Sequence, residues 1–539
     1  MPRDRVTISR STRHPLLFVA YPVLFVYASD IDFAPPIRTV LLWLVVYGAG
    51  AAALSWAAGR LMRDAAKGAV LTSAFAVMFF SYGHARNWLA DPLDQASVLG
   101  VGVGPEKLLT VFWATTGIVL WRWVQRAPPA AIATVTRGCW RAGLALVVLG
   151  IATVAAVASA GRPDGAVRRP VSGVAVRGAA AGRRLPDIYY IILDDYARGD
   201  VLKEVYGYDN SAFLSWLRST GFYVADRSRA NYVQTMLSLA SSLNSAYLDP
   251  AELTAGGPTR GRWRVALNVA TARFLTPSSQ PLVHLIQYNR AARILREHGY
   301  RFVAITSGFG GVQLPNADVA IRAGTFSDFD ESLIDTTPLA ELNRFGDRLE
   351  LHRRRVLYAL DHLSDPLPGS GPNFVFAHIL SPHPPFIFDA TGGPPAMPPA
   401  ARRVMLQDDV GGTAEADRDI VVRAYRDQVQ FVTARVRDAI ATILARGGTA
   451  PIIILQSDHG SDMLLDWGHP SEPGLAERTA ILNAFYVPPA IRAKLYAGIS
   501  PVNTFRVVLG HYFGGDSNLL PDESYFSTYR TPLAFRRVG

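Results

Sequence analysis

Two pairs of adjacent residues that can bind a metal stand directly after short apolar runs. Asp194 and Asp195 follow one such run, and Asp458 and His459 follow another. Carboxylate oxygens and imidazole nitrogens are ligands of divalent cations in proteins. Either pair alone could equally cap a helix or occupy a surface turn. Together they predict a single divalent-metal centre that is assembled from two distant parts of the chain.

The two apolar runs have the character of buried strands. Residues 187–193 and 451–456 are rich in Ile, Leu and Tyr, and glycines lie on both sides of the second run. Such runs are typical of strands inside a parallel sheet, and open α/β sheets bind ligands beyond the carboxyl ends of their strands. We therefore expect both residue pairs at one edge of a single sheet.

The remaining pattern between 187 and 539 alternates between strands and helices. It predicts further strands at 301–307, 373–378 and 480–487, and helices at 211–220, 281–298 and 414–446. Helices that connect buried strands produce a mostly parallel sheet with helices on both faces. We therefore expect an α/β domain in this part of the chain.

The first 160 residues are much more apolar than the rest. Five runs there are nearly free of charge, and they lie at 15–29, 40–59, 68–82, 108–120 and 142–160. A membrane span needs about 20 apolar residues, so the second and fifth runs qualify directly, whereas the others depend on mildly polar flanks. One such run could be a buried core helix, but five in succession favour a bundle of five transmembrane helices.

Basic residues predict the orientation of these spans. Arg and Lys are concentrated before the first span and in the loops that join the second to the third and the fourth to the fifth, while the alternate loops are mainly acidic. By the positive-inside rule, the N-terminus is cytoplasmic and the chain beyond about residue 160 is periplasmic or extracellular. We predict a transmembrane domain at 1–160, a linker rich in Gly, Arg and Pro at 161–186, and an extracytoplasmic α/β domain at 187–539.

The net charge of +10 does not indicate a protein that binds nucleic acid. The basic surplus lies in the first 186 residues, where it serves membrane topology, and 187–539 carries a slight acidic excess. The single cysteine, Cys139, falls in a predicted cytoplasmic loop, so the outer domain has no disulfide.

Four short motifs follow one another between residue 186 and the C-terminus. They are PDIYYIILDD at 186–195, NYVQTMLSLAS at 231–241, HILSPHPPF at 378–386 and SDHG at 457–460. In this order they are similar to the motifs of the sulfatase-like branch of the alkaline phosphatase superfamily. The apolar runs ahead of such a domain further resemble the layout of lipoteichoic acid synthases and lipid A phosphoethanolamine transferases.

This resemblance implies roles for individual residues. Asp194, Asp458 and His459 correspond to metal ligands, and Thr235 corresponds to the nucleophile, which also binds the metal. Asp195 corresponds to a second ligand in true sulfatases but to a non-ligand position in many phosphotransferase-like members. The alternative for Thr235 is a helix cap, because 236–242 is predicted to be helical.

Thr235 also separates this sequence from one class of relatives. Sulfatases of the formylglycine class oxidise a Cys or Ser, followed by Pro and Arg, to an aldehyde. A threonine cannot give that aldehyde, and Leu237 and Leu239 stand where Pro and Arg would be. The resemblance therefore favours transfer of a phosphoryl group over hydrolysis of a sulfate ester.

Three more residues are implied to contact the substrate. His383 corresponds to a histidine beside the ester oxygen, where an imidazole can donate a proton to the leaving group. His469 could be a second metal ligand, a phosphate contact or a loop residue. Arg478 could face the negative charge of the substrate or form a solvated salt bridge. His378, in contrast, is expected to be a satisfied core histidine.

The predicted function combines this centre with the membrane. The ligand set suits Mn²⁺ or Zn²⁺, with Mg²⁺ and Ca²⁺ as alternatives. A site tethered at the bilayer meets lipid headgroups at high effective concentration. We expect a phosphotransferase that moves a substituted phosphoryl group from a phospholipid headgroup to an envelope glycan or lipid. The alternatives are a sulfatase-like hydrolase of phosphate or sulfate esters and a non-enzymatic membrane protein.

Overall fold

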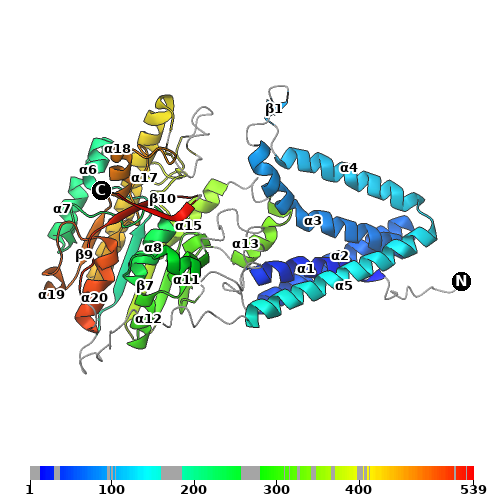
Figure 1. Cartoon of the computed structure of the whole chain (residues 1–539), viewed down its shortest axis with the longest axis horizontal. Coiled ribbons are helices and arrows are strands. Elements are labelled where there is room, and N and C mark those ends of the chain that lie inside the picture. Colours follow the sequence, from blue (N-terminus) through cyan, green and yellow to red (C-terminus); the bar gives the residue numbers. More distant parts are fainter. Residues whose placement is uncertain are drawn as a thin grey trace. The chain divides into compact units, whose positions relative to one another are not determined.

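A computed structural model describes most of the chain, and it divides into two compact units (Figure 1). The described residues are 12–29, 37–93, 97–98, 101–102, 105–159, 185–255, 280–308, 310–312, 314, 316–323, 328–340, 348–365, 369, 371–396, 405, 410–411, 413–514, 518–529 and 531–538. Nearly all of the predicted linker at 161–186 lies outside these residues.

Five long helices make up most of the first unit. They are α1 (His14–Ser29), α2 (Ile37–Met62), α3 (Ala65–Leu93), α4 (Pro105–Arg126) and α5 (Pro129–Ser159), with a short antiparallel pair, β1 (Ser97–Val98) and β2 (Val101–Gly102), between α3 and α4. Each of the five predicted apolar runs coincides with one of these helices.

Three segments among the described residues are long and apolar enough to cross a membrane. They are Ile37–Met62, Ala65–Arg86 and Pro129–Ala155. Helix α1 has 16 residues and spans only about 24 Å, less than the hydrocarbon core of about 30 Å. Helix α4 carries charged residues near both ends. The structure thus supports a membrane-embedded helical region, while the predicted count of five spans is not confirmed.

A segment from much later in the chain also belongs to the helical unit. Phe329 of α13 (Asp328–Asp335) is buried in a cluster with apolar residues of α1, α2 and α3, and its ring meets Tyr27 edge to face. The indole of Trp43 donates a hydrogen bond to Asp330, which further ties α13 to α2. The helical unit therefore consists of more than the N-terminal part of the chain.

In the part of the chain that the structure describes, the second unit is built on one seven-stranded sheet. Its strands, in spatial order, are β4 (Tyr223–Val224), β9 (Asn483–Tyr486), β8 (Ile452–Gln456), β3 (Ile188–Leu193), β7 (Asn373–Ile379), β5 (Arg301–Thr306) and β6 (Val319–Ile321). Every neighbouring pair is parallel except the two that involve β9. The prediction of a mostly parallel sheet is confirmed.

Helices cover both faces of this sheet. Those with residues in the two apolar cores are α6 (Gly199–Glu204), α7 (Ser211–Ser219), α8 (Thr235–Asn244), α9 (Pro250–Ala255), α11 (Gln280–Gln287), α12 (Arg290–Glu297), α15 (Arg348–His362), α17 (Arg418–Ala445), α19 (Pro489–Arg492) and α20 (Thr504–Tyr512). The side chains of β3 alternate between these cores: Tyr189 lies in the core that contains residues of α7, α15 and α17, and Tyr190 lies in the core that contains residues of α8, α11 and α20. This alternation is the side-chain period of a strand that is covered on both faces.

The described residues of this unit also form several short elements. They are α18 (Glu472–Thr479), the 3-10 turns Gly310–Val312, Glu415–Asp417 and Pro501–Asn503, and the antiparallel hairpin of β10 (Ser524–Thr528) and β11 (Thr531–Val538).

Two predicted elements differ from the structure. The helix predicted at 281–298 is broken into α11 and α12, because Asn289 accepts a hydrogen bond from the backbone N–H of Ala292 and starts a new helix. The strand predicted at 480–487 is confined to β9, which runs antiparallel to β8. Before it, Ala480 and Ile481 form isolated bridges outside the sheet.

Candidate metal centre

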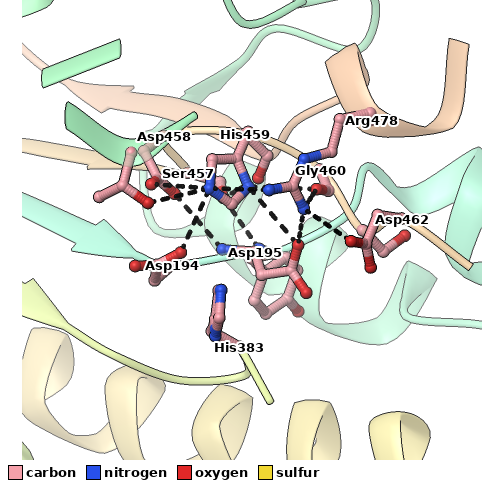
Figure 2. Close-up of polar contacts among 12 residues, drawn as sticks. Asp194, Asp195, His383, Ser457, Asp458, His459, Gly460, Asp462 and Arg478 are labelled. Carbon is pink, nitrogen blue, oxygen red and sulfur yellow. Dashed lines mark hydrogen bonds and ion pairs between the residues drawn. The ribbon is translucent and has the colours of Figure 1, made fainter. Parts of the chain in front are cut away.

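The carboxyl ends of β3 and β8 bring the predicted ligand pairs together. These strands are parallel neighbours, with Ile192 opposite Gln456 near their ends, so the residues that follow them reach the same edge of the sheet. Figure 2 shows Asp194 and Asp195 from one strand beside Asp458 and His459 from the other.

Asp194, Asp458 and His459 form the tightest group. One ligand atom from each lies within 4.8 Å of the others, and all three side chains are buried. Nε2 of His459 is 3.2 Å from Oδ2 of Asp458 and 3.6 Å from Oδ1 of Asp194. Ligands at about 2.1 Å from a tetrahedral cation lie about 3.4 Å apart, so this spacing suits a metal ion.

The electrostatics of the group also suit a cation. Burial raises the pKa of Asp458, and the negative charge of Asp194 raises it further. Burial lowers the pKa of His459 well below its ordinary value, and Arg478 adds to this effect, so the imidazole is neutral and can offer a lone pair. Burial alone would raise the pKa of Asp194, but neighbouring imidazoles, that of His383 first, lower it below the ordinary range.

Two carboxylate oxygens of the group are buried without a partner. Oδ1 of Asp194 and Oδ2 of Asp458 accept no hydrogen bond from the described residues. A buried charge is costly unless it is paired or binds a metal. Because these oxygens adjoin a neutral imidazole nitrogen, the residues fit a divalent cation.

Thr235 is the first residue of helix α8. The preceding residue, Gln234, has extended backbone angles of φ −130° and ψ 139° and is the N-cap, so Thr235 itself is not the cap. The Thr235 hydroxyl oxygen lies 3.0 Å from Nε2 of His459. Helix N-termini favour anions because their first N–H groups have no partner within the helix. A nucleophile at this position would adjoin both a cation and an anion site.

Asp195 has a partner of its own. Its Oδ1 accepts a hydrogen bond from Nη1 of Arg478 at 2.8 Å, and both side chains are buried. Arg478 also donates from Nε to the carbonyl of Val233 at 3.0 Å and from Nη1 to the carbonyl of Gly460 at 2.9 Å. The salt bridge considered for Arg478 therefore exists, but it is buried rather than solvated.

Two histidines approach the group from β7 and the loop after it. Nε2 of His378 is 3.1 Å from Oδ2 of Asp194, so this buried histidine is satisfied, as expected, but by a candidate metal ligand. The backbone N–H of His383 donates to the carbonyl of Asp194 at 3.0 Å. Figure 2 shows the ring of His383 pointing toward Asp194 and Asp195.

His469 lies apart from these residues. Its side chain is 93% exposed, in a turn where Oδ1 of Asp466 accepts hydrogen bonds from the N–H groups of Gly468 and His469. The structure thus places His469 outside the group of candidate metal ligands.

Sequence analysis missed Glu477, which holds the loop beyond His459. This carboxylate is buried on α18 and accepts hydrogen bonds from the hydroxyls of Tyr206 and Ser461 and from the N–H groups of Met463 and Leu464. The sequence around Glu477 does not indicate that it holds this loop, because its hydrogen-bond donors all lie in other parts of the chain.

Tyr425 of α17 was also missed. Its hydroxyl donates to the carbonyl of Asp195 at 2.7 Å and accepts from the N–H of Ala197 at 3.0 Å, so it fixes the turn after β3. Asp195 occupies the left-handed region in that turn, with φ +68°. A tyrosine inside a long helical pattern is indistinguishable by sequence from an ordinary core residue.

Comparison with known proteins gives matches among solved structures. No model of a protein family matches the sequence, and no curated protein matches it. The chain is similar to the periplasmic domain of phosphoethanolamine transferase EptC from Escherichia coli in complex with zinc, at 13% identity over 67% of this chain and 96% of that chain, with a TM-score of 0.39.

Two further structures represent a full-length membrane protein and a sulfatase. The integral membrane protein lipooligosaccharide phosphoethanolamine transferase A from Neisseria meningitidis matches at 11% identity over 95% of this chain and 96% of that chain, with a TM-score of 0.37. A sulfatase-like protein from Bacteroides thetaiotaomicron matches at 14% identity over 65% of this chain and 74% of that chain, with a TM-score of 0.37. The sequence resembles sulfatases in its motifs and phosphoethanolamine transferases in the layout of its apolar runs.

Proposed function

We propose that this chain is a membrane-anchored, metal-dependent phosphotransferase. It moves a substituted phosphoryl group from a phospholipid headgroup to a glycan or lipid of the cell envelope. The observation that supports this most directly is the position of the Thr235 hydroxyl, 3.0 Å from Nε2 of His459 and at the start of a helix. A hydroxyl placed beside a cation site and an anion-binding helix end is suited to attack on phosphorus.

Asp194, Asp458 and His459 would hold the cation, with Thr235 as a fourth ligand. Mn²⁺ or Zn²⁺ fits a set of oxygen donors with one imidazole, and Mg²⁺ and Ca²⁺ stay alternatives. When bound, the cation would lower the pKa of the threonine hydroxyl and offset negative charge on the phosphoryl oxygens.

The reaction that we propose has two steps. Oγ1 of Thr235, after giving its proton to water, attacks the phosphorus of the lipid, and the bond from phosphorus to the diacylglycerol oxygen breaks. That oxygen takes a proton, for which His383 is the donor we propose, and the headgroup stays on Thr235 as a phosphodiester. In the second step a hydroxyl of the acceptor gives its proton to His383 and attacks the same phosphorus, and Oγ1 of Thr235 is released and regains a proton from water.

Arg478 and His469 are proposed to act on the substrate rather than on the cation. Nη2 of Arg478 lies 3.3 Å from Nε2 of His459, on the side of the ring where Thr235 lies, so its positive charge is available to phosphoryl oxygens. His469, which lies on an exposed turn, would contact the substrate from the outer side of the loop.

The membrane supplies the donor in this proposal. Segments of membrane-crossing length support an anchor in the cytoplasmic membrane, and the distribution of basic residues supports placing 187–539 on the periplasmic or extracellular side. The bilayer and a phospholipid or envelope-glycan substrate are the partners that we propose. A tethered site meets headgroups at high effective concentration, which favours a lipid donor.

Intact-mass spectrometry of the full-length protein tests this proposal. The protein is incubated with Mn²⁺ and a mixture of phosphatidylglycerol and phosphatidylethanolamine, without an acceptor. We expect an adduct on the wild-type chain whose mass identifies the headgroup, and no adduct on Thr235→Ala. Thr442→Ala is the matched control, because Thr442 is exposed on α17 and its hydroxyl only bonds the carbonyl of Asp438 in the same helix.

The outcomes separate the proposal from its alternatives. An adduct that persists in Thr235→Ala would show that another residue is the nucleophile. If headgroup phosphate is released into water as fast as lipid is consumed, even with acceptor present, the protein is a hydrolase. If neither lipid is consumed and no adduct forms although metal is bound, the lipid-donor proposal is overturned.

A further inference from the structure

The residue before Thr235 is held by the C-terminal hairpin. Gln234 is buried, and its side-chain Nε2 donates a hydrogen bond to the carbonyl of Ser527 at 2.8 Å. The same nitrogen lies 3.3 Å from the Ser527 hydroxyl. Ser527 belongs to β10, which forms a two-stranded sheet with β11. This contact therefore joins the start of α8 to an element outside the seven-stranded sheet.

The hairpin also holds the chain further ahead of α8. The backbone N–H of Tyr525 donates to the carbonyl of Asn231 at 2.8 Å, and Tyr232 forms an isolated parallel bridge with Tyr525. The rings of these two tyrosines stack, with their centroids 5.6 Å apart. The segment that leads to Thr235 thus lies along β10, and Gln234 makes the last of these contacts before the helix begins.

Gln234 does not cap the helix with its side chain. It occupies the N-cap position of α8, but its amide makes no hydrogen bond to the helix end. Short polar side chains such as Ser, Asp and Asn are preferred at this position because they can accept from the first N–H groups of the helix. The amide of Gln234 is directed to Ser527 instead. A buried residue that forgoes the local capping bond for a distant contact indicates a role other than helix stability.

We infer that Gln234 is a positioning residue for the proposed nucleophile, and that its bond to Ser527 fixes the direction in which Thr235 presents its hydroxyl. The inference rests on the proposed function, because it gives Gln234 a part in the first step. Oγ1 of Thr235 lies 3.0 Å from Nε2 of His459, and a turn of the backbone at Gln234 would move this hydroxyl away from that nitrogen. A displacement of about 1 Å at a reacting group can cost about a hundredfold in rate.

Single-turnover kinetics of the full-length, detergent-solubilised protein test the inference. The protein is loaded with Mn²⁺ and mixed with increasing amounts of phosphatidylglycerol and phosphatidylethanolamine without acceptor, and the adduct on the peptide containing Thr235 is followed by mass spectrometry. We expect Gln234→Ala to lower the maximal rate of adduct formation by about tenfold to a hundredfold. The lipid concentration that gives half of this rate should stay within about twofold of the wild-type value, because Gln234 orients the nucleophile and does not bind the lipid.

Two further variants separate positioning from a general loss of stability. Gln234→Met keeps the length and bulk of the side chain but lacks the donor, so we expect it to fold and to lose rate as Gln234→Ala does. Asp187→Ala is the destabilised control, because Asp187 precedes β3 at the opposite end of the strand and accepts from the backbone N–H of Asn373 at 2.7 Å. It should unfold at a lower temperature than the wild type and keep the wild-type maximal rate.

Two kinetic results would overturn the inference. One is a wild-type maximal rate in folded Gln234→Met, whatever its dependence on lipid. The other is a loss of rate in Asp187→Ala as large as that in the Gln234 variants, which would mean that the rate follows stability alone.

Amide hydrogen exchange distinguishes this failure from failure of the proposed function. A wild-type chain that forms no adduct contradicts the proposed function, but the anchor at Gln234 is still tested in the metal-free protein. We expect the peptide 231–240 to exchange faster in Gln234→Met than in the wild type, while peptides from β3 exchange equally in both. Equal exchange of the peptide 231–240 in the two proteins would overturn the inference without any assay of phosphoryl transfer.

Discussion

Gly460 packs so closely against Glu477 that a Cβ on the glycine would lie 2.3 Å from the carbonyl oxygen of Glu477. The N–H of Gly460 also donates to the carbonyl of Arg478 at 2.7 Å. The loop that carries Asp458 and His459 is therefore joined directly to α18, which carries the buried partners of that loop.

This close approach predicts that Gly460→Ala destabilises the α/β unit. The added methyl group would meet backbone atoms, which cannot move away as the end of a side chain can, so we expect a loss of about 2 kcal/mol or more. The unfolding temperature, followed by tryptophan fluorescence, measures it. Gly447→Ala is the control, because a Cβ there has no atom within 4 Å, and its effect should stay within about 0.5 kcal/mol. Equal unfolding temperatures for both variants would show that the loop can shift to make room for the methyl group at little cost in stability.

Glu477→Ala should be among the most damaging single substitutions outside the ligands. It would leave buried donors from Tyr206, Ser461 and Met463 without their acceptor, and breaking such a network costs about 3 kcal/mol or more. Glu472→Ala, on an exposed position of the same helix, should cost less than about 1 kcal/mol. Thermal unfolding of the two variants side by side provides the comparison, and a Glu477→Ala variant as stable as Glu472→Ala would show that the network contributes little.

Metal affinity should rise with pH. Burial and the charge of Asp194 raise the pKa of Asp458 in the metal-free protein, so a proton competes with the metal for this carboxylate. The folded, metal-free protein holds that proton at pH values where an unfolded chain, with an ordinary carboxyl pKa of about 4, has lost it. Its stability therefore falls as pH rises through this window, while metal binding strengthens.

Isothermal titration with Mn²⁺ at about pH 5.5 and about pH 8 measures the pH effect. We expect tighter binding at the higher pH, with protons released on binding in buffers of different ionisation enthalpy. An affinity that does not change across this range would mean that Asp458 is already ionised without the metal.

The strands that position the candidate ligands could be predicted because a strand buried on both faces appears in the sequence as a continuous apolar run. Residues 187–193, 373–378 and 451–456 are apolar except at their ends, and β3, β7 and β8 are buried along their full length. The candidate ligands could be placed at one edge of the sheet because they stand immediately after those strands. The break between α11 and α12 was not predicted, since the cap residue Asn289 sits inside a pattern that continues as helix on both sides.

The connections that hold the site could not be predicted in the same way. Asp195 and Arg478 are 283 residues apart, and their ion pair depends on how α18 folds back onto the end of the sheet. The buried helix α13 carries ordinary apolar residues, and nothing in them indicates that they pack in the helical unit. Sequence pattern specifies which residues are buried, but the choice of partner comes from the tertiary fold.

The proposed phosphotransferase is tested most directly by following both halves of a labelled donor. Phosphatidylethanolamine carries one isotope in its diacylglycerol and another in its ethanolamine, and is mixed with the full-length protein and Mn²⁺ without acceptor. We predict that diacylglycerol is released in an initial burst of about one per active chain, that the ethanolamine label stays on the peptide containing Thr235, and that Thr235→Ala shows neither. Release of diacylglycerol at the same rate by wild type and Thr235→Ala, with no label on this peptide, would contradict the proposed role of Thr235.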